Sequence, residues 1–102
     1  MAHGRNKYQS RENRARVREI LLRDWDPIGV YGIPQAADEY DTYANRAYVM
    51  LMDEGATASE IARYLYIVAT EHMGLTDHGR LAEKSDQVGQ LLVQLRPEFG
   101  TH

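Results

Sequence analysis

The stretch from Thr57 to Gly74, T-A-S-E-I-A-R-Y-L-Y-I-V-A-T-E-H-M-G, decides the fold class. Thr57 and Glu60 match the S/T-x-x-E capping box, in which two residues satisfy each other's backbone N–H groups at a helix start. Apolar residues then recur at helical spacing, and Gly74 supplies a stop because glycine readily adopts the left-handed conformation. This stretch predicts a helix over 58–73, whose apolar face holds Ile61, Tyr64, Leu65, Val68 and His72.

The same helical spacing of apolar residues continues on both sides of this stretch. No segment keeps the strict alternation of apolar and polar residues that is typical of a strand. Three further helices are therefore predicted, over 10–25, 36–54 and 78–96, and short connections make successive helices antiparallel neighbours in a four-helix bundle. The expected apolar faces are Val17, Ile20, Leu21 and Trp25; Tyr40, Tyr43, Ala44, Ala47, Met50 and Leu51; and Leu81, Ser85, Val88, Leu92 and Leu95.

Residues that favour helix ends set the expected boundaries. Ser10 is a candidate N-cap for the first helix, and Gly55 ends the second. Pro97 is expected to end the last helix because proline lacks a backbone N–H. Gly79 and Gly89 lie inside that helix, where each costs about 1 kcal/mol relative to alanine.

Length and composition predict a single globular domain, and the helical periodicity makes it all-α. The 102 residues, 26% charged and 43% hydrophobic, are those of an ordinary globular chain, with a domain over 10–99 and a flexible basic N-terminus over 1–9. The chain has no cysteine, which excludes disulfides, thiol nucleophiles and thiolate metal sites. No apolar run is long enough to span a membrane, and the start M-A-H-G-R-N-K lacks the apolar segment of a signal peptide. A cytoplasmic protein is expected.

Charge is distributed unevenly along the chain. Residues 1–23 hold seven bases and two acids, a charge of +5, whereas residues 24–102 hold five bases and thirteen acids, a charge of −8. On the first helix, one flank of the apolar face carries Arg11, Arg14 and Arg18, and the other carries Arg16 and Arg23. We expect these arginines mainly to pair with acids of residues 38–60. An acidic protein partner and nucleic acid are the alternatives. Nucleic acid is the less favoured of the two, because no second basic helix follows.

The segment from Asp24 to Pro34, D-W-D-P-I-G-V-Y-G-I-P, connects the first two helices and is unusually apolar for such a connection. One interpretation is that it packs over the end of the bundle and covers Trp25 with Ile28 or Val30. The other is that it forms a partly exposed apolar surface for another protein. Its candidate binding residues are Ile28, Val30, Tyr31 and Ile33.

Two polar groups raise the question of a metal or catalytic site. Asp38, Glu39 and Asp41 lie in a first helical turn, where acids are favoured by the helix dipole; they could also hold a cation or contact a basic patch. A second group contains residue types that bind metals: Glu71, His72, Asp77 and His78. It lacks a recognised ligand spacing such as H-E-x-x-H. The sequence thus predicts no metal, no cofactor and no catalytic residue.

Three short motifs carry a family resemblance: W-D-P-I-G-V at 25–30, D-E-Y-D at 38–41 and M-G-L at 73–75. With them the chain resembles a family of small bacterial helical proteins of the domain-of-unknown-function kind, over residues 17–95. The resemblance implies a bacterial, intracellular, all-α protein without a catalytic residue. Some proteins of this size and acidity act as immunity factors that cover a toxin.

These observations predict a non-enzymatic protein-binding module. Its surface is expected to combine the apolar residues Ile28, Val30, Tyr31 and Ile33 with Asp38, Glu39 and Asp41, and to bind a protein partner or a second copy of the chain. A toxin-immunity role, and a small enzyme or metal-binding protein that uses carboxylates and His72, are the alternatives. Neither nucleic acid nor a membrane is an expected partner.

Overall fold

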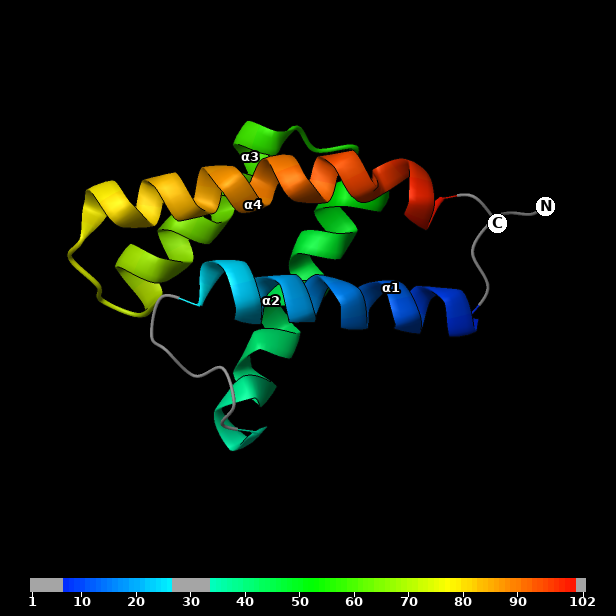
Figure 1. The fold of residues 1–102 in the computed structure, drawn as a ribbon, viewed down its shortest axis with the longest axis horizontal. Coiled ribbons are helices and arrows are strands. Elements are labelled where there is room, and N and C mark those ends of the chain that lie inside the picture. The colour runs from blue at the N-terminus through cyan, green and yellow to red at the C-terminus, as the bar shows by residue number, and fades with distance from the viewer. Residues whose placement is uncertain (1–6, 27–33, 101–102) are drawn as a thin grey trace.

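The computed structural model describes residues 7–26 and 34–100, and within this part all regular structure is helical (Figure 1). Helix α1 spans Lys7–Ile20 and continues into a π-helical turn, Leu21–Trp25. Helix α2 spans Pro34–Met52. Helix α3 spans Ala58–Ile67 and also continues into a π-helical turn, Val68–His72, and α4 spans His78–Phe99. The predicted all-α class, with four helices, is confirmed.

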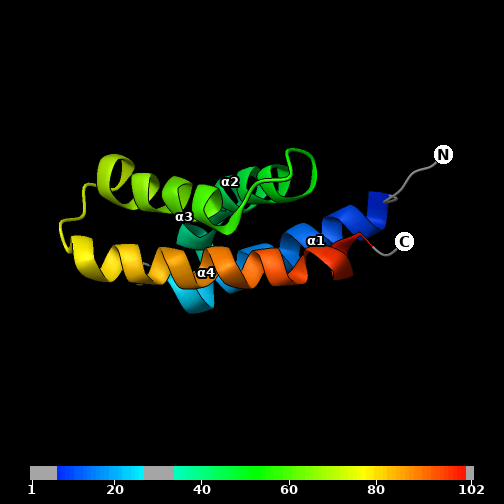
Figure 2. The same ribbon diagram turned by 90° about the horizontal axis from the view of Figure 1, so that it is seen from above.

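The helices pack around α4. In Figure 2, α3 and α4 run antiparallel as a hairpin, and Figure 1 shows α1 running alongside α4. Helix α2 instead crosses α1 steeply (Figure 1), so the regular up-and-down bundle is not confirmed. The Cα radius of gyration is 13.4 Å, which matches a compact domain of this length.

Capping places the ends of the central helices where the sequence predicts them. The Thr57 hydroxyl accepts a hydrogen bond from the Glu60 backbone N–H at 3.1 Å, and the Thr57 N–H donates to the Glu60 carboxylate at 2.8 Å. Gly55 and Gly74 have φ values of 63° and 72°, the left-handed conformation that ends a helix without a Cβ clash. The capping box and both glycine stops are confirmed.

Helices α1 and α4 extend beyond their predicted ends. Helix α1 begins at Lys7, so Ser10 is not its N-cap; the Ser10 hydroxyl accepts a hydrogen bond from Arg14 Nη1 at 2.6 Å. Helix α4 continues past Pro97 to Phe99, whose side chain is 1% exposed and packs on the Tyr48 ring. Pro97 cannot donate the backbone hydrogen bond of an interior helical residue, and burial of Phe99 favours keeping the last turn despite that cost. A flexible N-terminus was predicted for residues 1–9. Residues 1–6 lie outside the described residues, and residues 7–9 belong to α1.

Most residues of the predicted apolar faces are buried in the core, which also contains Leu22, Tyr48, Ala56, Ala62, Ala69 and Phe99. Trp25 is 3% exposed, which confirms that it is buried; the predicted cover by Ile28 or Val30 lies outside the described residues. Ser85 is buried in the middle of the α4 face and accepts a hydrogen bond from the Trp25 indole N–H at 3.2 Å. The four expected faces also contribute these buried residues: Val17, Ile20, Leu21, Tyr40, Tyr43, Ala44, Ala47, Met50, Leu51, Ile61, Leu65, Val68, Leu81, Val88, Leu92 and Leu95.

The first and third helices each end in a π-helical turn. Each contains a backbone bond that spans five residues, Asp26 N–H to the Leu21 carbonyl at 2.7 Å and Met73 N–H to the Val68 carbonyl at 2.9 Å. A π-helical turn holds one more residue than an α-helical turn, so the side chains after it are rotated relative to the 3.6-residue period. His72, which was expected at the core edge, lies in the second of these turns; it is exposed, although its ring contacts the buried Tyr43.

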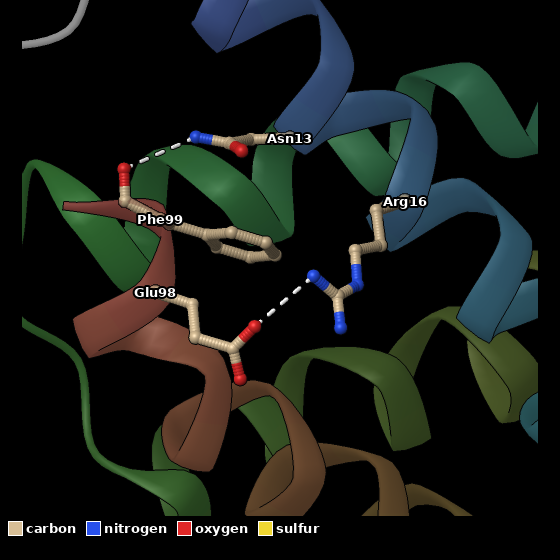
Figure 3. A network of polar contacts seen from close by, with 4 residues as sticks. All are labelled: Asn13, Arg16, Glu98 and Phe99. Atoms are coloured by element: carbon tan, nitrogen blue, oxygen red, sulfur yellow. Dashed lines mark hydrogen bonds and ion pairs between the residues drawn. The ribbon is translucent and has the colours of Figure 1, made fainter. Parts of the chain in front are cut away.

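Polar contacts join the C-terminal end of α4 to α1 and α2. Asn13 is buried and donates to the Phe99 carbonyl at 3.2 Å (Figure 3) and to the Tyr48 hydroxyl at 3.1 Å. Beside it, Arg16 pairs with Glu98 at 3.2 Å (Figure 3). Because a buried amide is costly to leave unsatisfied, these bonds fix where α4 ends against α1.

Candidate functional site

The structure describes the borders of the predicted binding surface. Its apolar residues, Ile28, Val30, Tyr31 and Ile33, lie outside the described residues. Asp38 belongs to α2, and its side chain also lies outside them. Glu39 and Asp41 are described, and both are exposed. The site can therefore be built from the residues that flank the apolar segment and from these two carboxylates.

An aromatic cluster of Trp25, Tyr40 and Tyr43 joins the two helices that flank the apolar segment. The Trp25 ring centroid lies 5.6 Å from that of Tyr40 and 6.1 Å from that of Tyr43, within the range of favourable edge and tilted contacts. The Tyr40 hydroxyl donates to the Asp26 carboxylate at 3.0 Å. Asp26, the last described residue before the segment, is thus bonded to α2, which follows it.

The two described carboxylates of the acidic turn have partners within the chain. Glu39 accepts a hydrogen bond from the Tyr43 hydroxyl at 3.2 Å. Asp41 lies 3.4 Å from Arg18 Nε, and the two side chains are 52% and 38% exposed. An ion pair this exposed contributes about 0–1 kcal/mol, so Asp41 can exchange Arg18 for another cation at little cost.

The predicted pairing of the α1 arginines with acids is confirmed in part. Arg18 pairs with Asp41 of α2, inside the expected range of acids. Arg16 instead pairs with Glu98 of α4. Arg23 pairs with the adjacent Asp24 at 3.0 Å. Because α1 lies between α2 and α4, its two flanks meet acids from different helices.

Tyr43 is the titratable group of this site with the largest change in pKa. Burial, reinforced by the hydrogen bond to Glu39 and by the negative charge of Glu39, raises the pKa of Tyr43 to about 12 from an ordinary value of 10.0. A raised pKa means that folding favours the protonated phenol. Tyr43 therefore contributes stability that is complete below pH 10.0 and is lost as the pH rises through about 12.

Removing the charge of Glu39 tests this assignment. Glu39→Gln is expected to lower the pKa of Tyr43 toward its ordinary value and to shift alkaline unfolding accordingly, because neutral glutamine no longer repels the phenolate. Phenolate absorbance, followed as a function of pH, measures the titration, and Tyr43→Phe identifies which step belongs to Tyr43. A titration that is the same in wild type and Glu39→Gln would contradict the role of the carboxylate.

The histidines do not form a metal centre in the described part of the chain. No three His, Asp or Glu side chains of that part converge closely enough to hold an ion. His72 contacts the Tyr43 ring edge-on, with 6.0 Å between centroids. His78 Nδ1 instead lies 2.7 Å from the Tyr66 hydroxyl. This Tyr66–His78 contact links α3 to α4 across the Gly74 turn, and helical periodicity could not reveal it because the two residues belong to different helices.

Over residues 7–26 and 34–100, every helix is too short or too polar to cross a membrane. Comparisons with known proteins found no family model, no curated protein and no solved structure that matches the chain.

Proposed function

We propose that the chain is a non-enzymatic protein-binding module. Its binding surface combines the apolar segment, with Ile28, Val30, Tyr31 and Ile33, and the acidic start of α2, with Asp38, Glu39 and Asp41. The complementary surface is an apolar patch bordered by basic residues, on another protein or on a second copy of the chain. An immunity-like contact with a basic toxin is one form of this function.

The observation that carries the proposal is the contact between the two ends of the apolar segment. The Tyr40–Asp26 hydrogen bond of 3.0 Å, together with the Trp25–Tyr40 ring contact, holds the first part of α2 against the π-helical turn that follows α1. A segment whose ends are fixed loses less conformational freedom on binding than one with free ends. Four large apolar or aromatic residues within seven positions can then act as binding anchors.

The acidic turn supplies a second part of the recognition. Glu39 and Asp41 are exposed, and Asp41 has only a weak, solvent-screened ion pair. Carboxylates at the edge of an apolar surface accelerate association with a basic partner and reject acidic ones. Charge thereby selects the partner, while the apolar residues supply most of the affinity.

Affinity capture from the native host tests the proposed surface. We expect the triple variant Tyr31→Ala, Asp38→Ala, Asp41→Ala to lose a partner that the wild type retains, because it removes one anchor and two steering charges. A matched control removes one exposed apolar residue and two carboxylates elsewhere on α3 and α4, as Ile67→Ala, Glu71→Ala, Glu83→Ala. Far-ultraviolet circular dichroism verifies that both variants remain folded.

The proposal fails if the site variant and the control retain the same partners as the wild type. Self-association is measured separately by sedimentation, with the same two variants. A metabolite or metal ion recovered with the wild type and lost in a His72→Ala variant would favour the enzymatic alternative.

A further inference from the structure

A surface cavity of about 240 Å³ lies between α1 and α2, on the side of α1 that carries Arg11, Arg14 and Arg18. The three arginines are spaced by three and four residues, so they share one helical face. Asp41 and Asn45 of α2 form the opposite wall, and Ala15 completes the lining. The cavity therefore gathers three guanidinium groups and one amide around one small volume.

Arg14 and Arg18 of this cavity contact other side chains of the protein. Arg14 Nη1 donates to the Ser10 hydroxyl at 2.6 Å, and its Cζ lies 6.0 Å from the ring centroid of Tyr48, which is buried. Arg18 Nε lies 3.4 Å from Asp41, in an exposed ion pair that an anion can displace. A guanidinium has five N–H donors, and a group that is already oriented loses less side-chain entropy when it binds an anion.

The charge of the lining selects the class of ligand. Three positive arginines and one negative aspartate leave a charge of +2 around the cavity. A phosphate monoester carries a charge of about −1.5 to −2 at neutral pH and offers three strong acceptor oxygens, whereas a carboxylate carries only one negative charge. Arginine forks bind such oxygens in pairs. With a volume of about 240 Å³, the cavity has room for a phosphoryl group and a small attached group.

We propose that this arginine cavity binds the phosphoryl group of a small phosphorylated molecule. Arg14 and Arg18 contact the phosphoryl oxygens, Arg11 adds positive charge, and the Asn45 amide is positioned to donate from α2. Asp41 competes with the ligand for Arg18 and repels its negative charge. This site shares Asp41 with the proposed protein-binding surface, but its arginines are not part of that surface.

The role of Asp41 gives the test two variants with opposite expected effects. Inorganic phosphate is titrated into the full chain near neutral pH and low salt, and binding is followed by calorimetry. Arg14→Gln is expected to weaken phosphate binding about tenfold, as typical for the loss of one charge-assisted hydrogen bond. Asp41→Asn is expected to tighten binding severalfold, because it removes the competing carboxylate. Arg63→Gln, on α3 and outside the lining, changes the net charge as Arg14→Gln does and should leave binding at the wild-type level.

Further probes distinguish the sources of the anion. Acetate is expected to bind more weakly than phosphate, since it cannot neutralise the charge of +2. A phosphate monoester such as glycerol phosphate is expected to bind at least as well as inorganic phosphate. Tight binding of duplex DNA with a steep salt dependence would instead assign the arginines to nucleic acid and overturn the small-molecule proposal.

Three results would overturn the site itself. They are the absence of saturable phosphate binding, equal losses in Arg14→Gln and Arg63→Gln, and weaker binding by Asp41→Asn. Amide chemical shifts, measured by NMR for Arg14→Gln and wild type, verify that the variant is folded, so that a loss of phosphate binding is not caused by a loss of structure. Because Asp41→Asn should tighten phosphate binding while loss of the same carboxylate should weaken partner binding, the two proposals can fail separately.

Discussion

Replacing Trp25 with alanine is expected to lower the free energy of unfolding by about 3–5 kcal/mol, a large part of the 5–15 kcal/mol that stabilises a typical domain. The side chain is 3% exposed and packs against Tyr40 and Tyr43. Alanine would leave a large cavity at the junction of α1, α2 and α4. It would also remove the indole donor of the hydrogen bond to Ser85, a residue that is 1% exposed.

Denaturant unfolding followed by far-ultraviolet circular dichroism measures this loss, because the variant lacks the chain's single tryptophan. Trp25→Phe is the control: it keeps most of the ring volume and removes the N–H, so a smaller loss is expected. A loss below about 1 kcal/mol for Trp25→Ala would contradict the packing described here. So would wild-type fluorescence with the emission maximum of a solvent-exposed tryptophan.

Replacing Gly89 with alanine is expected to destabilise the protein by about 1–3 kcal/mol, although alanine is the better helix former. A Cβ at Gly89 would lie 2.5 Å from the Ala58 carbonyl oxygen and 3.2 Å from the Ala62 backbone nitrogen. Both atoms belong to the backbone of α3, so a side chain cannot rotate away to relieve the clash. Helices α3 and α4 would have to move apart, which would loosen the hairpin.

Gly79 is the matched control in the same helix. A Cβ there meets nothing within 4 Å, so Gly79→Ala should raise the free energy of unfolding by up to about 1 kcal/mol through helix propensity alone. Thermal and denaturant unfolding of the two variants compare the signs directly. If Gly89→Ala and Gly79→Ala stabilise the protein equally, α3 and α4 do not approach as closely as described.

The fold class could be predicted because its signals are local. The capping box at Thr57 and Glu60 and the stops at Gly55 and Gly74 depend only on neighbouring residues, and apolar periodicity identified the buried faces. Gly89 shows the limit of that reasoning. The sequence marks it as a weak point of a helix, whereas the structure uses it for a close backbone contact.

Features that depend on tertiary packing could not be predicted in the same way. Helical spacing alone grouped His72 with the apolar face of its helix, whereas the residue is exposed and contacts the Tyr43 ring of α2. The continuation of α4 beyond Pro97 depends on the burial of Phe99 against Tyr48, a residue of another helix. Both errors arise where tertiary contacts override a local rule.

The surroundings of the candidate site depend on how α2 crosses α1. That crossing brings Asp41 to Arg18 and gathers three arginines beside Asn45. Sequence analysis anticipated that the arginines pair with acids but could not specify which ones, since a residue's partner depends on the angle between two helices.

The central claim is that charge and apolar anchors act together in one protein-binding surface. The most direct test measures association and dissociation rates of the captured partner with wild type, Asp38→Ala/Asp41→Ala and Tyr31→Ala. We expect the double acid variant to associate more slowly, with a weaker dependence on salt, and Tyr31→Ala to dissociate faster. If both variants associate with and dissociate from the partner at the wild-type rates, the proposed protein-binding surface is wrong.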